Sequence, residues 1–300
     1  MQKNNDLVAA FVYARAWRMA HHSQRGLAHE QSGRPNEDTV ACSVSDSDVL
    51  MVAVADGVGS GEQGDLASAL VARHWVDVQI PAEPAASLQL GHQTLVGCEA
   101  VMSEGLQAAG VRAHGSSGSM FVGAWLFPSG EIVLGHVGDC RAYRLHGGDL
   151  LPLTRDHSYQ NLGLQQPAWR KPDDPARMIG GGMMGLPDVQ RVRLEFGDWL
   201  LLCSDGLHAA LTHAQLTQAI RQALEACHPV DRISQDFLKS ICLHLAELAV
   251  RAGGRDDISV VLARFEGVKT KEPTNENFAN FENDFFESVW PSDVLRTAAS

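Results

Sequence analysis

Two kinds of hydrophobic pattern alternate along the chain. Short apolar runs bounded by turn residues predict β-strands. They cover residues 15–25, 40–43, 49–55, 119–127, 131–137, 142–145, 150–153, 189–194, 199–203 and 259–265. Apolar residues spaced three or four apart predict helices, and these cover residues 66–76, 95–106, 216–224 and 237–248.

The order of these elements is strands, two helices, strands, two helices and one strand. This order does not match the alternating strands and helices of a parallel α/β sheet. It predicts an α+β fold with a central antiparallel β-sandwich, flanked on its outer faces by helix pairs. The short turns 128–130, 138–139 and 147–148 favour antiparallel pairing of the strands that they join.

Three stretches depart from this pattern. Residues 1–14 form an N-terminal extension ahead of a domain predicted for residues 15–267. Residues 155–188 hold several prolines and three consecutive glycines, which is typical of a long irregular loop, and we expect this loop to lie over the site as a flap. Residues 268–300 form an acidic, aromatic-rich C-terminal segment.

The C-terminal segment has an amphipathic pattern. Phe278, Phe281, Phe285 and Val289 fall on one helical face, with acidic residues opposite. A disordered tail does not usually carry so many aromatic residues. The face around residues 278–290 is therefore expected to dock either on the parent domain or in a groove of a partner protein.

Acidic residues recur at the ends of the apolar runs. Four of these positions place an aspartate beside glycine or beside a second acid, namely Asp56-Gly57, Gly138-Asp139, Asp205-Gly206 and Asp256-Asp257. A fifth acidic position, Asn36-Glu37-Asp38, precedes a strand. Carboxylates that meet at the ends of buried strands repel one another unless a cation binds them, and oxygen-rich sites suit magnesium or manganese. The pattern predicts a metal-dependent enzyme.

Composition narrows the function classes. The net charge is -12, and the absence of a lysine- or arginine-rich run argues against nucleic-acid binding. The six cysteines are scattered, which favours reduced thiols and a cytoplasmic location. We expect no membrane association, because no apolar stretch is long enough to cross a bilayer and the N-terminus lacks a convincing signal peptide.

Six motifs in order give the sequence a family resemblance. They are Arg34-Pro-Asn-Glu37-Asp38, Asp56-Gly57-Val-Gly59, Gly138-Asp139-Cys140-Arg141-Ala142-Tyr143, Leu153-Thr154-Arg155-Asp156-His157-Ser158, Cys203-Ser204-Asp205-Gly206-Leu207 and Gly253-Gly254-Arg255-Asp256-Asp257-Ile258-Ser259. Together they resemble the PP2C-type (PPM) serine/threonine protein phosphatases, most closely the bacterial branch. Each motif alone is weak evidence, but six in the same order are specific.

The resemblance implies a function and a set of ligands. It implies that a metal-activated water hydrolyses phosphoserine and phosphothreonine in proteins, at a site with two Mn²⁺ or Mg²⁺ ions and in some members a third. Asp56 then bridges both metals, Glu37 and the Gly57 carbonyl hold one, Asp205 and Asp256 hold the other, and Asp139 helps to bind the third. The expected catalytic residues are Asp56, Asp205 and Arg34, and the expected partners are a phosphorylated protein and a cognate Ser/Thr kinase.

The sequence departs from the family pattern at four positions. The arginine that members carry four residues before the glutamate is Gly33 here, and Arg34 lies one residue nearer. Val58 stands where animal enzymes have a histidine proposed as general acid. Cys140 replaces the usual serine, and Asp257 replaces the usual asparagine. Neither of the last two changes removes an expected metal ligand.

Other interpretations stay open at this point. Residues 59–64 match GxGxxG, a dinucleotide-binding signature, although the acidic neighbours and the lack of a βαβ pattern count against it. A phosphatase of a partner-switching pathway and a pseudophosphatase that only binds are the remaining alternatives. His29 lies near the expected phosphate site, but most histidines are neither ligands nor proton carriers.

Overall fold

Two antiparallel sheets form the centre of the protein. The computed structural model describes residues 14–59, 63–111, 117–225 and 233–267. In this part of the chain, one sheet has the order β1-β10-β9-β6-β7 and the other has the order β2-β3-β4-β5-β8. The strands of the first are β1 (Trp17–Gln24), β6 (Arg141–His146), β7 (Asp149–Pro152), β9 (Trp199–Cys203) and β10 (Ile258–Phe265). Those of the second are β2 (Asp38–Val44), β3 (Leu50–Gly59), β4 (Ser117–Leu126), β5 (Glu131–Val137) and β8 (Asp188–Arg193).

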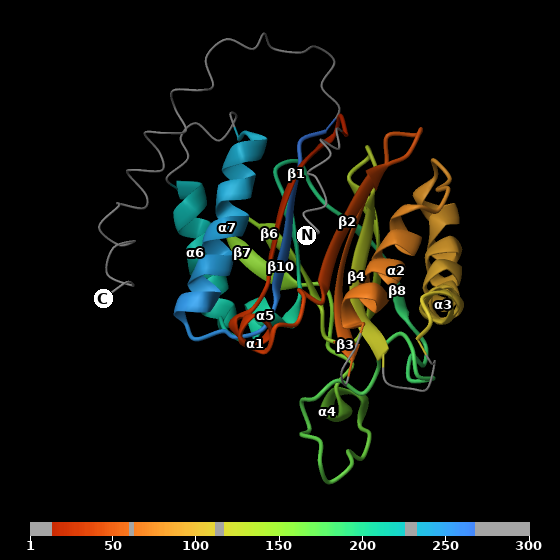
Figure 1. Ribbon diagram of the computed structural model, residues 1–300. Helices are drawn as coiled ribbons and strands as arrows, with labels where there is room; N and C mark the ends of the chain where they lie inside the picture. The colour runs from red at the N-terminus through yellow and green to blue at the C-terminus, as the bar shows by residue number, and fades with distance from the viewer. Residues whose placement is uncertain (1–13, 60–62, 112–116, 226–232, 268–300) are drawn as a thin grey trace, which may run out of the picture.

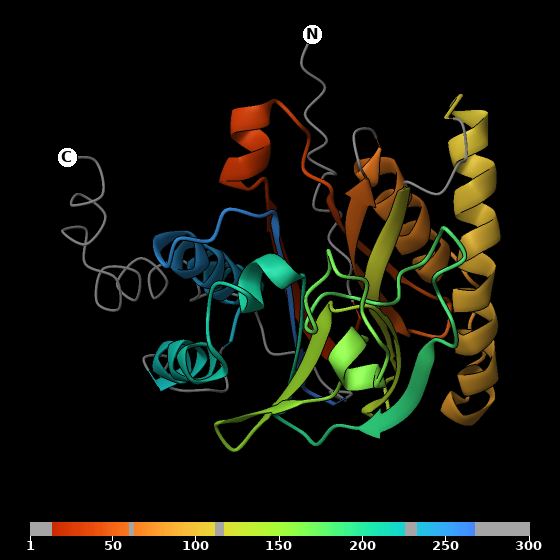
Figure 2. The ribbon, with the colours of Figure 1, turned by 90° about the horizontal axis from the view of Figure 1, so that it is seen from below.

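A pair of helices covers the outer face of each sheet (Figure 1). Helices α2 (Gly64–Val76) and α3 (Pro84–Ala108) lie on the sheet that contains β3. Helices α6 (His213–Glu225) and α7 (Gln235–Arg251) lie on the sheet that contains β10. The predicted α+β sandwich flanked by helix pairs is therefore confirmed, and Figure 2 shows the four layers from below.

Strand β3 explains why the central runs are apolar without a break. Leu50, Val52 and Val54 pack between the two sheets. The alternate residues Met51, Ala53 and Ala55 pack against the helix pair. Successive side chains of a strand point to opposite faces, so a strand buried on both faces is apolar at every position.

The turn 138–139 does not join paired strands, which corrects one sequence expectation. Strand β5 pairs with β4 and β8, whereas β6 pairs with β7 and β9 in the other sheet. Gly138 has a φ of 96°, which a residue with a side chain rarely adopts, and this conformation lets the chain cross between the sheets in two residues. The crossing places Asp139 between the sheets at one end of the sandwich.

Three short helices were not predicted: α1 (Leu27–Ser32), α4 (Tyr159–Leu162) and α5 (Asp205–His208). Helix α4 belongs to the irregular segment between β7 and β8, which projects from the lower end of the molecule in Figure 1. Ile179 ties that segment to Ser119 of β4 through two backbone hydrogen bonds of 2.9 Å. The flap over the site stays a prediction. The predictions for residues 1–13 and for the face at 278–290 lie outside the described residues.

Candidate metal centre at one end of the sandwich

Acidic side chains from separate elements meet at one end of the two sheets. The pKa of Asp56, near the end of β3, is raised well above its usual value, first by burial and then by Asp205, Asp38, Asp139 and Asp256. Carboxylates shift one another's pKa in this way only when they are close and poorly screened by water. The expected ligands Asp56, Asp139, Asp205 and Asp256 are therefore brought together.

Asp139 and Asp205 also have raised pKa values. Burial and then Asp205 raise the pKa of Asp139 to about 7. Burial and then Asp256 raise the pKa of Asp205 to about 6. Asp205 sits at the first position of α5, directly after β9, and Asp256 lies just before β10. The neighbouring strands β9 and β10 thus deliver two of the carboxylates to one place.

Glu37 stands at the start of β2, on the opposite sheet. Its side chain is buried, and both carboxylate oxygens accept hydrogen bonds from the Arg34 guanidinium, at 2.7 and 2.8 Å. Its backbone carbonyl accepts a bond of 3.0 Å from the N–H of Gly57. Burial is the main cause of its raised pKa, and Arg34 acts in the opposite direction. Arg34, Glu37 and Gly57 therefore form one contiguous edge of the site.

A polar network joins the two sheets behind these carboxylates. The Ser204 hydroxyl donates to Asp38 Oδ2 at 2.6 Å and accepts a bond of 2.9 Å from the N–H of Ser259. The Ser259 hydroxyl in turn bonds to Ser23 at 2.8 Å. Asp38 is buried, and its bond to Ser204 links β2 to the end of β9, so it supports the site.

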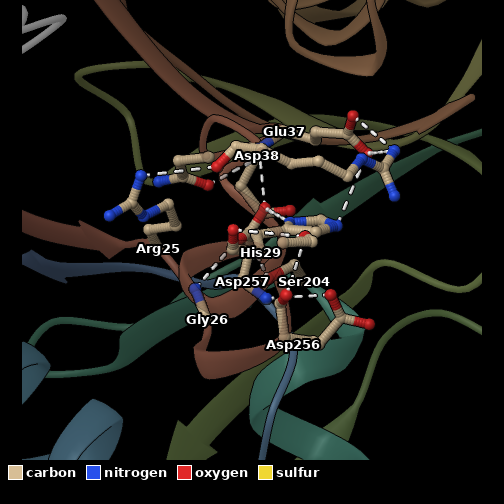
Figure 3. A network of polar contacts seen from close by, with 12 residues as sticks. Arg25, Gly26, His29, Glu37, Asp38, Ser204, Asp256 and Asp257 are labelled. Atoms are coloured by element: carbon tan, nitrogen blue, oxygen red, sulfur yellow. Dashed lines mark hydrogen bonds and ion pairs between the residues drawn. The ribbon is translucent and has the colours of Figure 1, made fainter. Parts of the chain in front are cut away.

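Asp257 connects three parts of the site (Figure 3). Its side chain is only 3% exposed. Oδ1 accepts a bond of 2.7 Å from the N–H of Gly26, and Oδ2 accepts one of 2.6 Å from the N–H of Glu37. Oδ2 also lies 2.7 Å from Nδ1 of His29. Asp257 thus fixes α1 and the start of β2 against β10.

The residues present fit divalent metal ions. Asp139 is 8% exposed, and its Oδ1 atom has no hydrogen-bond partner among the described residues. A buried carboxylate oxygen without a donor is costly unless a cation or water satisfies it. The carboxylates of Asp56 and Asp205 lie close enough to Asp139 to shift its pKa or to be shifted by it, and such oxygen ligands suit Mg²⁺ and Mn²⁺.

Two residues at this end of the sandwich, Asp257 and Asp38, make contacts that the sequence does not indicate. From the sequence, Asp257 is only a replacement that spares the expected ligands, and Asp38 has no assigned role. The contacts of Asp257 join residues more than 200 positions apart, so no local pattern could have indicated them. The one available signal was the aspartate doublet at 256–257.

A second cluster lies next to Gly138, where β5 pairs with β8. His136, His157 and Asp188 bring potential ligand atoms within 4.8 Å of one another, beside a cavity of about 580 Å³. The N–H of Gly138 donates to Nδ1 of His157, so the proton of the neutral ring sits on Nε2, 3.1 Å from Asp188. A protonated nitrogen cannot bind a metal, which makes His157 a structural link between strands.

A pH-dependent loss of stability is expected from His136. Burial and then His157 lower its pKa to about 4. Between pH 6.5 and 4 the unfolded chain binds a proton at His136 that the folded chain does not. The contribution of neutral His136 to the free energy of unfolding is therefore complete above pH 6.5 and declines as the pH falls toward 4. In His136→Gln, the fall in the free energy of unfolding between pH 6.5 and pH 4 should be smaller than in the wild type, by up to about 3 kcal/mol.

Urea unfolding at pH 7.5 and pH 4.5, with a chelator present throughout, measures this difference. His213→Gln, at an exposed position where α6 begins, is the matched control and should keep the wild-type pH dependence. If His136→Gln and the wild type lose the same free energy of unfolding between pH 7.5 and pH 4.5, the expectation is contradicted.

The fold and the acidic site define a class of protein, and comparison with known sequences gives the same class. The signature of the family described as "Protein phosphatase 2C" matches residues 25–241. The chain belongs to this family. The resemblance stated from the six motifs is thereby confirmed, and the dinucleotide-binding alternative is wrong, since the strands paired in both described sheets run antiparallel.

Curated relatives come from bacteria and plants. The chain is 28% identical over 257 residues to the serine/threonine protein phosphatase PstP of Mycobacterium tuberculosis, covering 82% of this chain and 44% of the relative. It is 25% identical over 240 residues to the protein phosphatase PhpP of Streptococcus pneumoniae, covering 76% of this chain and 90% of the relative. The chain therefore spans less than half of PstP and most of PhpP.

Solved structures share the fold. The crystal structure of M. tuberculosis PstP/Ppp has a TM-score of 0.66 at 24% identity and covers 84% of this chain and 99% of that one. PppA of Pseudomonas aeruginosa, described as a regulatory component of T6SS, has a TM-score of 0.65 at 22% identity and covers 83% and 98%. The PstP catalytic domain was also solved in complex with two manganese ions.

Two further findings concern the expected environment. Within the described ranges, no helix is both long and apolar enough to cross a bilayer. Five cysteines fall in this part of the chain, and all are free: Cys42, Cys98, Cys140, Cys203 and Cys242. Reduced thiols agree with the sequence prediction for these five positions.

Proposed function

We propose that this chain hydrolyses phosphoserine and phosphothreonine in proteins with the help of two Mn²⁺ or Mg²⁺ ions. One observation carries the proposal. Carboxylates from both sheets converge at one end of the sandwich, where burial and mutual repulsion raise the pKa of Asp56 far above its usual value. Family membership and the similarity to PstP and PhpP support the same reaction.

Each acidic group has a role in this proposal. Asp56 would contribute to both metals, Glu37 and the Gly57 carbonyl would hold one, and Asp205 and Asp256 would hold the other. Asp139 contributes to a third, weaker site. Two divalent cations held by these residues would lower the pKa of a bound water and neutralise the phosphoryl oxygens of the substrate.

Arg34 orients the substrate in this proposal. It lies beside Glu37 and is partly exposed, with a side-chain accessibility of 36%. A guanidinium has five N–H donors in a fixed fork, so a contact with Glu37 is compatible with one to a phosphate. Its planar shape matches two phosphoryl oxygens, which would hold the phosphorus in line with the attacking water.

The substrate side of the proposal is a phosphorylated protein. A cognate Ser/Thr kinase supplies that substrate, and both act in the cytoplasm. The net charge of -12 agrees with a protein substrate and disfavours a nucleic acid. The kinase and the location follow from the sequence interpretation, and the phosphoproteins that accumulate when the gene is deleted test the substrate.

The central test is hydrolysis of p-nitrophenyl phosphate and of a phosphothreonine peptide, each with Mn²⁺, with Mg²⁺ and with a chelator. Metal counting on the dialysed protein accompanies the assay. We expect turnover only when a divalent metal is present and at least two metals bound per chain at saturation. Hydrolysis that continues unchanged in chelator would overturn the proposal, and so would a folded protein that binds no metal.

A further inference from the structure

The position of His29 is not explained by packing alone. The residue lies in α1, the short helix between Gly26 and Gly33, and its side chain is 13% exposed. Figure 3 shows the ring between Asp257 and Glu37. A ring nitrogen and carboxylate oxygens of Asp256 and Asp257 lie within 4.8 Å of one another. His29 therefore faces the carboxylates at the end of the sandwich.

The hydrogen bonds around Asp257 determine the tautomer of His29. Both oxygens of Asp257 already accept a backbone N–H, one from Gly26 and one from Glu37. An ionised carboxylate only accepts, so the contact of 2.7 Å to Nδ1 requires the proton on Nδ1. In the neutral ring, Nε2 then carries a lone pair.

The atom that carries this lone pair, Nε2 of His29, lies near a carboxylate oxygen of Glu37. Nε2 lies 3.8 Å from Oε2 of Glu37, too far for a hydrogen bond. A metal with ligand distances of about 2.0–2.2 Å fits between two atoms separated by up to about 4.2 Å. A histidine that donates its second N–H to a carboxylate while its other nitrogen meets a cation is the usual arrangement of metal-bound histidines.

We propose that His29 is a nitrogen ligand of the metal centre through Nε2, with Asp257 as the residue that positions its ring. The inference rests on the proposed metal-dependent function and adds a nitrogen to a site otherwise built from oxygen. Asp139 Oδ1, buried without a partner among the described residues, independently indicates that a cation belongs at this end of the fold.

A nitrogen ligand changes which metal the site prefers. Mg²⁺ takes oxygen ligands and keeps its waters, whereas imidazole suits transition metals. The site should therefore bind Mn²⁺ more tightly than Mg²⁺ by a margin that depends on His29. Loss of the ligand should reduce Mn²⁺ affinity by about tenfold to a hundredfold and leave Mg²⁺ affinity much less changed.

Pulsed electron paramagnetic resonance of the Mn²⁺-loaded full chain tests the bond directly. Histidine nitrogen coupled to Mn²⁺ gives a modulation that changes when the protein is labelled with ¹⁵N-histidine. We expect this signal in the wild type and in His92→Gln, a control on α3, and its loss in His29→Gln. Calorimetry with Mn²⁺ and with Mg²⁺ measures the selectivity of the same three proteins.

Asp257→Asn keeps the size of the side chain but offers one acceptor oxygen in place of two. We expect it to lower Mn²⁺ affinity by roughly tenfold, because a positioning partner of a ligand has been weakened. Circular dichroism checks that each variant is folded. Two folded variants that bind Mn²⁺ like the wild type would overturn the inference.

The outcomes separate this inference from the proposed function. A wild-type protein that binds no Mn²⁺ contradicts the metal-dependent function itself. A wild-type protein that binds Mn²⁺ without coupling to histidine nitrogen keeps that function and overturns the role of His29. Coupling that persists in His29→Gln assigns the nitrogen to another histidine and also overturns it.

Discussion

An Asp205→Asn variant should lose phosphatase activity by a hundredfold or more while its fold becomes no less stable. The substitution removes a charged group from the metal centre, and the lost stabilisation of the transition state is on the order of several kcal/mol. Burial, and then repulsion by Asp256, raises the pKa of Asp205 to about 6. Removing that charge should raise stability in chelator by on the order of 1 kcal/mol.

Turnover of p-nitrophenyl phosphate and thermal melting with and without Mn²⁺ measure both effects. Asp149→Asn serves as the control, because Asp149 is exposed at the start of β7 and belongs to no metal site proposed above. This control should keep wild-type turnover and the wild-type increase in melting temperature on adding Mn²⁺. An Asp205→Asn protein with wild-type turnover would refute the assignment of Asp205, and one that melts early in chelator would contradict the repulsion argument.

Gly57→Ala should destabilise the protein by about 3 kcal/mol and weaken metal binding as well. A Cβ atom at this position would lie 2.0 Å from the carbonyl oxygen of Gly64 and 2.8 Å from that of Glu37. Both obstacles are backbone atoms, so β3 and the start of α2 would have to separate. The shift would move the Gly57 carbonyl and Glu37, which are expected to share a metal.

Thermal melting and Mn²⁺ titration of Gly57→Ala test this expectation against Gly97→Ala. A Cβ at Gly97, inside α3, meets only the end of the His74 side chain, at 3.2 Å. Alanine favours a helix interior over glycine by roughly 0.5–1 kcal/mol, so Gly97→Ala should melt at or slightly above the wild-type temperature. If the two variants melt alike, the close approach at Gly57 is less restrictive than the geometry indicates.

The long elements could be predicted from sequence because their patterns are local. The apolar run at 49–55 became β3, and the helical spacing over 216–224 became part of α6. Helix α1 was not predicted because its six residues, which lie between two glycines, are too few to show a hydrophobic periodicity. The sheet assignment of β5 and β6 was wrong because a short turn indicates proximity in space but not shared hydrogen bonds.

The acidic positions could be predicted because they flank strands: Asp56, Asp139 and Asp205 lie toward or after the ends of β3, β5 and β9, and Glu37 and Asp256 lie just before β2 and β10. Their role as metal ligands stays a prediction. The roles of His29 and Asp257 depend instead on contacts across the fold. Gly26, Glu37 and His29 all bond to Asp257 although it lies more than 200 residues away. Such a contact depends on how the two sheets pack, and a local sequence motif does not indicate this packing.

The crossing at Gly138 and the placement of the acids on both sheets have a thermodynamic consequence. Glu37 and Asp56 belong to β2 and β3, whereas Asp205 and Asp256 flank β9 and β10 in the facing sheet. A cation held by both groups adds its binding free energy to the cohesion between the sheets. Cation concentration and the quality of packing between the sheets then become interchangeable sources of stability, so a substitution that loosens the interior can be tolerated in manganese-rich conditions and not in manganese-poor ones.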